Sequence, residues 1–69
     1  MGVDMTLKVN GQDRNVTDGT TVLALIVQHN LTPQKVAVEL NRRLIRTEKY
    51  DMVLKAGDEV EIVTFVGGG

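Results

Sequence analysis

The residues best suited to chemistry lie at the end of the chain, where Val66 is followed by Gly67, Gly68 and Gly69. Glycine has no side chain to pack, and ordering the backbone of one residue costs roughly 1–2 kcal/mol. Three glycines therefore contribute little to binding affinity but lengthen the chain. At about 3.5 Å per residue they extend about 10 Å beyond a folded domain. A narrow channel could admit this tail while excluding any Cβ. The reactive group would then be the α-carboxylate of Gly69.

Terminal glycines are also typical of a linker or of a frayed chain end. On its own, the triple glycine favours that second interpretation slightly. Its position directly after the last predicted core strand favours a functional tail.

The composition excludes most other chemistry. The chain has 69 residues, enough for one small domain, and eight Lys and Arg against nine Asp and Glu. This charge balance argues against a nucleic-acid partner and against a polybasic membrane-binding surface. With no cysteine and a single histidine, His29, the sequence lacks a thiol nucleophile, a disulfide and a multi-histidine metal site. No secretory signal is found, so a cytoplasmic protein is expected.

Hydrophobic periodicity predicts one helix and several short strands. Residues 5–9 alternate apolar and polar, Asn10-Gly11 predicts a hairpin turn, and residues 14–16 form the returning strand. Apolar residues at helical spacing predict a helix over residues 22–29, with Thr21 as its N-cap. Further strands are expected at residues 36–40, 44–46 and 59–65, with a loop or a single helical turn at 47–51.

This order of elements predicts an α+β fold, with a mixed sheet of four to five strands and one main helix on one face. A single domain is expected over residues 1–66, followed by a flexible tail at 67–69. The side chains predicted to lie beneath the helix are Leu7, Val9, Val38, Leu40, Val60 and Ile62.

The last strand also presents apolar side chains to the opposite face of the sheet. Because neighbouring strand residues point to opposite faces, Val63 and Phe65 are expected on the face without a helix. Two interpretations stay open: this face binds a partner, with Val63, Phe65 and Val66 in contact, or a loop over residues 47–52 folds across it.

Other polar residues have simpler explanations. His29, near the helix end, is interpreted as a half-buried packing residue. Arg42, Arg43 and Arg46 could dock an acidic partner surface, but they also suit a solvated hairpin edge that discourages strand addition. The remaining carboxylates are interpreted as surface charges, because so small a fold offers no preorganised pocket: Glu48, Asp51, Asp58, Glu59 and Glu61.

Residues 36–41, 55–63 and 65–69 resemble the ThiS sulfur carriers of thiamine biosynthesis, which are relatives of the small subunit of molybdopterin synthase. The most specific features are Gly57-Asp58, the following strand and the terminal glycines. One departure is Arg42, which follows Asn41 where many members have glycine.

The resemblance implies a ubiquitin-like β-grasp fold and a protein co-substrate rather than an enzyme. It implies that an E1-like adenylyltransferase of the ThiF type uses ATP and Mg²⁺ to adenylate Gly69, with no cofactor bound to the carrier itself. Sulfur from a cysteine desulfurase pathway would then give a thiocarboxylate, which donates sulfur on a thiazole synthase of the ThiG type.

Three classes of function stay open. The favoured class is a sulfur carrier, delivering to thiazole rather than to molybdopterin or another acceptor. The second is a ubiquitin-like modifier that is joined to target lysines through the same adenylate. The third is a passive β-grasp interaction module.

Overall fold

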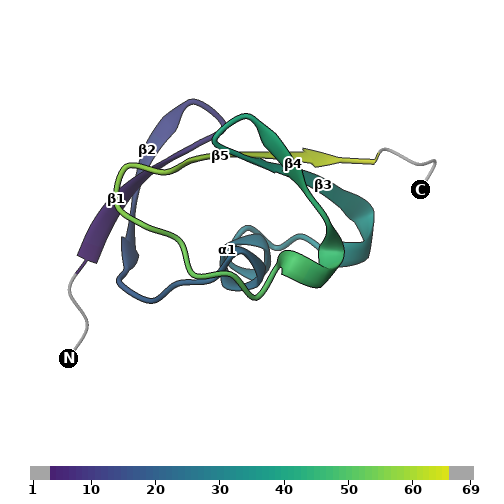
Figure 1. Ribbon diagram of the computed structural model, residues 1–69, viewed down its shortest axis with the longest axis horizontal. Coiled ribbons are helices and arrows are strands. Elements are labelled where there is room, and N and C mark those ends of the chain that lie inside the picture. Colours follow the sequence, from purple (N-terminus) through teal and green to yellow (C-terminus); the bar gives the residue numbers. More distant parts are fainter. Residues whose placement is uncertain (1–3, 66–69) are drawn as a thin grey trace.

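A mixed sheet of five strands organises residues 4–65, the part of the chain that the computed structural model describes. Its strands are β1 (Asp4–Val9), β2 (Gln12–Thr17), β3 (Val36–Leu40), β4 (Arg43–Ile45) and β5 (Glu59–Thr64). They lie in the order β2-β1-β5-β3-β4, with β1 and β5 parallel and the other neighbours antiparallel. The last strand of the chain is therefore the central strand of the sheet (Figure 1).

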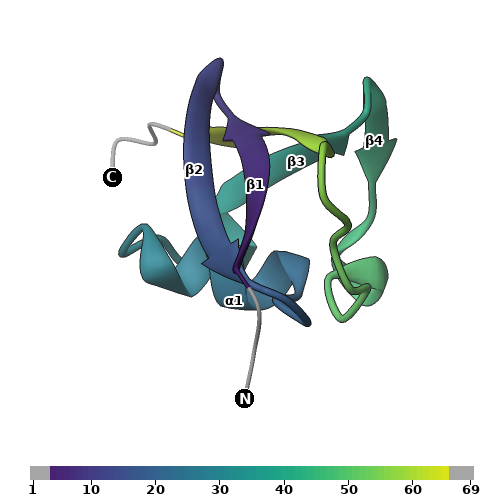
Figure 2. The same ribbon diagram turned by 90° about the vertical axis from the view of Figure 1, so that its left-hand side faces the viewer.

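One face of the sheet is covered and the other is open. The helix α1 (Val22–Gln28) and the long connection between β4 and β5 lie beneath the same face (Figures 1 and 2). No described element lies across the opposite face in either view. The predicted α+β architecture, with one main helix on one side, is confirmed.

Both hairpins turn through two residues with positive φ. Asn10 and Gly11 have φ of 50° and 82°, as expected for the primed turn that this dipeptide favours. The second turn uses Asn41 and Arg42, with φ of 52° and 72°. Arginine is an unusual residue in this left-handed region, because its Cβ is crowded there.

The helix begins and ends where its capping residues predict. The Thr21 hydroxyl accepts a hydrogen bond from the backbone N–H of Ala24 at 3.1 Å. At the other end Asn30 has φ of 59°, and the N–H of Leu31 donates to the carbonyl of Ile26 at 3.1 Å. His29 is the C-cap and is half-buried, with Nδ1 2.9 Å from the Leu25 carbonyl. This agrees with its interpretation as a packing residue.

The core lies between the sheet and α1. Of the six predicted core residues five are buried, and Leu40 is only half-buried because it ends its strand. Buried hydrophobic residues come from four of the five strands, from α1 and from the connection between β4 and β5: Leu7, Val9, Val16, Val22, Leu25, Ile26, Val36, Val38, Tyr50, Leu54, Val60 and Ile62.

The connection between β4 and β5 contains a single helical turn, one of the two conformations predicted for residues 47–51. This is the 3₁₀ turn η2 (Thr47–Lys49), and the connection buries Tyr50 and Leu54 in the core. The carbonyls of Tyr50 and Met52 accept hydrogen bonds from the first two N–H groups of α1, at 2.8 and 3.1 Å. These bonds hold the connection beside the helix.

No helix within residues 4–65 is long and apolar enough to cross a membrane. The predicted division into a domain over 1–66 and a tail over 67–69 depends on residues outside the described part of the chain, so it stays a prediction.

Candidate functional site

The candidate site is the part of β5 that leads into the glycine tail. On one side β5 pairs with β1 through Glu59 and Val60, and on the other it pairs with β3 along its length. One more bond follows the strand, from the N–H of Phe65 to the carbonyl of Lys35 at 2.9 Å. The root of the tail is therefore fixed by main-chain pairing as far as Phe65.

Two asparagine side chains extend this pairing. Asn10 accepts a hydrogen bond from the N–H of Ile62 at 2.8 Å and its amide donates to the Ile62 carbonyl at 3.3 Å. The Asn10 side chain thus takes the place that the next residue of β1 would occupy. Asn41 accepts from the N–H of Glu59 at 2.9 Å and donates to the Asp58 carboxylate at 3.0 Å.

Sequence reasoning did not find these contacts. It identified both asparagines as turn residues, but Asn10 and Ile62 are separated by 52 positions in the chain. The available signal was an asparagine at a left-handed turn position, where its side chain is free to bond a neighbouring backbone.

The open face carries the predicted apolar side chains. Val63 and Phe65 are 57% and 59% exposed, as the strand alternation predicted. The segment 47–52 bonds α1, and its Thr47 and Glu48 border a hollow beside Phe65, but it leaves more than half of the Val63 and Phe65 side chains exposed and so does not cover them. Leu44 of β4, 70% exposed, was not predicted to belong to this face. Leu44 and Phe65 line this shallow hollow of about 320 Å³.

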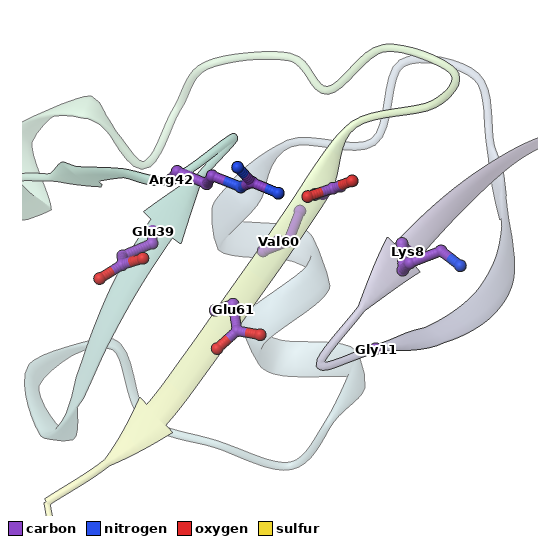
Figure 3. Close-up of a pocket in the computed structure, with 7 residues that line it drawn as sticks. Lys8, Gly11, Glu39, Arg42, Val60 and Glu61 are labelled. Atoms are coloured by element: carbon purple, nitrogen blue, oxygen red, sulfur yellow. The ribbon is translucent and has the colours of Figure 1, made fainter.

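The other predicted site residues are Val66, Gly67, Gly68 and Gly69. They lie outside the described residues, so their roles stay predictions. The three arginines of the second hairpin are exposed on or beside β4, and the structure shows Arg42 reaching across the open face toward β5 (Figure 3).

Charge on the open face is concentrated in the middle of the sheet. Glu39 of β3 and Glu61 of β5 are direct cross-strand neighbours, and Glu59 lies two positions earlier on the same face. Within residues 4–65 one ion pair is formed, between Lys8 and Asp13 at 3.3 Å, and both side chains are largely exposed. The same residues contain no group of three or more His, Asp or Glu side chains that could hold a metal ion.

Comparison with known proteins decides the family. A family model described as the ThiS family matches residues 7–69. The chain belongs to the ThiS family. This confirms the family that the sequence resemblance indicated.

Individual relatives agree with this assignment. The sulfur carrier protein ThiS of Bacillus subtilis is 40% identical over 65 residues, which is 91% of this chain and 98% of that protein. A crystal structure of the thiamine biosynthesis protein ThiS from Geobacter metallireducens superposes with a TM-score of 0.79 and 35% identity, covering 94% of this chain and all of that one. The predicted β-grasp fold of the ThiS family is therefore confirmed.

Two further relatives are larger proteins. Thiazole synthases of Magnetococcus marinus and Paramagnetospirillum magneticum are 38% and 41% identical to this chain, each over 66 residues. The match covers 94% of this chain and 20% of either synthase, so the chain spans about a fifth of their length.

Proposed function

We propose that the protein carries sulfur for thiazole formation, as a thiocarboxylate at Gly69. The observation that carries this proposal is the extent of the family match, which runs from residue 7 to residue 69 and so includes all three glycines. The tail belongs to the family pattern, which argues against a foreign linker.

The chemistry explains why the carrier needs no catalytic side chain. A carboxylate is a poor electrophile, because its charge is delocalised and an oxide leaving group is poor. In the proposed sequence a Gly69 carboxylate oxygen attacks the α-phosphorus of ATP, and pyrophosphate leaves with Mg²⁺ balancing its charge. The terminal sulfur of a persulfide then attacks the acyl carbon, and AMP departs with one of the carboxylate oxygens. A thiol reductant cleaves the remaining S–S bond, which leaves the thiocarboxylate. ATP and Mg²⁺ belong to the activating partner.

The proposed activating partner is an E1-like adenylyltransferase of the ThiF type. It docks on the open face, where Val63 and Phe65 supply apolar contact beside the root of the tail. Val66 continues this contact in the proposal. In the proposal the sulfur comes from a cysteine desulfurase, which need not contact the carrier directly. The reactions are proposed to take place in the cytoplasm.

The proposed acceptor is a thiazole synthase of the ThiG type. Support comes from the two thiazole synthases in which a segment similar to this chain makes up a fifth of the polypeptide. A carrier-like segment and a synthase share one chain in those proteins, which favours thiazole over molybdopterin as the destination of the sulfur.

Mass spectrometry tests the proposal. The protein is incubated with ATP, Mg²⁺, its adenylyltransferase, a cysteine desulfurase, cysteine and a thiol reductant that cleaves persulfide S–S bonds. Replacement of one terminal oxygen by sulfur is expected. Conjugates to other proteins would instead indicate a modifier, and an unchanged mass would indicate a passive module. Addition of thiazole synthase with its small substrates should then return the carrier to the carboxylate form.

A further inference from the structure

A hollow of about 270 Å³ lies on the open face of the sheet, between the two hairpin turns. Its acidic side chains are Glu39, Glu59 and Glu61. Figure 3 shows Glu39 on β3 and Glu61 on β5 projecting from the same side of the sheet. Lys8 and Arg42 line the hollow from opposite sides of β5. Three carboxylates therefore share this hollow with two cations.

The placement of these carboxylates works against folding. Glu39 and Glu61 face each other directly across β3 and β5, and like charges in that position destabilise a sheet. Lys8 and Arg42 line the same hollow, but within the described residues neither glutamate forms an ion pair with them, and the ion pair formed there joins Lys8 to Asp13. Like charges that face each other across two strands without a structural benefit are typical of a functional surface.

The shape of the cluster favours a large organic cation. Residues 4–65 contain no group of three His, Asp or Glu side chains that could hold a metal ion. An arginine guanidinium is broad and planar, carries five N–H donors and loses water more readily than an ammonium group. It can contact carboxylates on two neighbouring strands at the same time.

The hollow lies next to the exposed side chains of Val63 and Phe65, which form the apolar patch of the open face. Glu59, Glu61 and Val63 occupy alternate positions of β5, and Phe65 follows in the direction of the tail. In the proposed docking on the open face, the partner that holds the tail lies over this row of side chains. Protein interfaces commonly combine an apolar centre with charged contacts that set orientation and association rate.

We propose that the acidic hollow receives an arginine side chain of the adenylyltransferase that activates Gly69. This inference rests on the proposed function, because it assumes that such an enzyme docks on the open face. The arginine contact sets the position of the carrier along the enzyme, and the apolar patch supplies contact nearer the reactive end. A second copy of this chain, whose Arg42, Arg43 and Arg46 have the same chemistry, is the competing occupant. It is less favoured because that contact would cover the root of the tail.

The test neutralises the facing pair in the double variant Glu39→Gln/Glu61→Gln. Its matched control is Asp18→Asn/Asp51→Asn, which removes two exposed carboxylates outside the hollow. ATP–pyrophosphate exchange by the purified adenylyltransferase gives the KM for the carrier, and calorimetric titration gives the dissociation constant. Both constants should rise about tenfold in the hollow variant, with kcat nearly unchanged, and stay within about twofold in the control.

Two further measurements separate docking from folding. Thermal unfolding should show the hollow variant to be at least as stable as the wild type, since the like-charge pair is gone. Added salt should weaken binding of the wild type more than binding of the variant. A purely structural role for the two glutamates would give a less stable variant instead.

Several outcomes overturn the inference. One is an unchanged KM in the hollow variant, and another is an equal rise in the control. A wild-type dimer in sedimentation equilibrium that the hollow variant loses would assign the hollow to a second copy. If the wild type binds the enzyme through Glu39 and Glu61 but supports no pyrophosphate exchange, the docking contact stands and the proposed activation fails. Absence of any binding overturns both.

Discussion

The side chain of Asn10 replaces a missing main-chain partner of the central strand, bonding both polar groups of Ile62. Asn10→Ala leaves that N–H and that carbonyl without a protein partner, so the free energy of unfolding should fall by about 1–2 kcal/mol. Urea denaturation measures the loss. Asn15→Ala is the control, because Asn15 makes an exposed bond to the Thr6 hydroxyl and should cost less than about 0.5 kcal/mol. An equal loss of unfolding free energy in both variants would show that the bonds from Asn10 to Ile62 do not stabilise the fold more than an exposed side-chain bond.

Arg42 occupies a backbone conformation that suits glycine better. With φ of 72°, its Cβ is crowded, which costs about 1 kcal/mol relative to glycine. Arg42→Gly should therefore raise the free energy of unfolding by about 0.5–1 kcal/mol despite the greater freedom of glycine in the unfolded chain. Arg43→Gly, one residue later in β4, should lower it by a similar amount because glycine weakens a strand. Thermal unfolding of the two variants checks the opposite signs.

Turn and capping residues in the sequence correctly predicted the features that depend only on neighbouring residues. Asn10-Gly11, the Thr21 cap and the Asn30 helix end each act over a few positions, and the structure confirms all three. The bonds from Asn10 to Ile62 and from Asn41 to Glu59 could not be predicted, since they require knowing that β5 enters the sheet between β1 and β3.

At the scale of elements, the side chains along β5 divide between the two faces of the sheet: one set packs in the core and the other is exposed. Val60 and Ile62 are buried under the sheet, whereas Val63 and Phe65 point outward. Phe65→Asp should raise the KM of the carrier for the adenylyltransferase at least tenfold, because an exposed aromatic beside the tail is a strong candidate for a binding hot spot. Its free energy of unfolding should change by less than about 0.5 kcal/mol.

A matched control for this prediction is Val53→Asp. Val53 is 55% exposed, close to the 59% of Phe65, but it lies in the connection that bonds the helix on the covered side. This variant should bind the enzyme normally. A large loss of stability in Phe65→Asp would place Phe65 in the core and contradict the docking role.

Elements with a clear period were predicted, and the single helical turn allowed at residues 47–51 is present as η2, but the burial of the connection around it was not predicted. Strand alternation and helical spacing gave all five strands and α1 within a few residues of their observed ends. Between β4 and β5, Tyr50 and Leu54 are isolated apolar residues in a polar stretch, so no period marks them as buried. Their burial depends on the helix N-terminus, whose N–H groups bind the carbonyls of this connection.

At the scale of the whole molecule, the proposed function assigns folding and chemistry to different parts of the chain. The buried core residues lie between positions 7 and 62, and the open face needs no covering element to complete the fold. A domain of this size buries only about 60% of its unfolded surface, so it has little stability to spare. A reactive carboxylate at Gly69, as proposed, follows the core in the sequence and avoids the cost of burying a charge within so small a domain.

Because the core and the proposed reactive end are separate in the sequence, adding one residue at either end of the chain should have different effects. An alanine after Gly69 moves the carboxylate one residue onward and places a Cβ where the proposed channel admits glycine alone. ATP–pyrophosphate exchange should be lost, while the melting temperature stays unchanged because the core ends at Ile62. An alanine before Met1 adds the same atoms at the other end of the sequence and should leave exchange intact. If the chain extended after Gly69 is adenylated at the normal rate, the enzyme does not read the glycine end, and the proposed role of Gly69 is wrong.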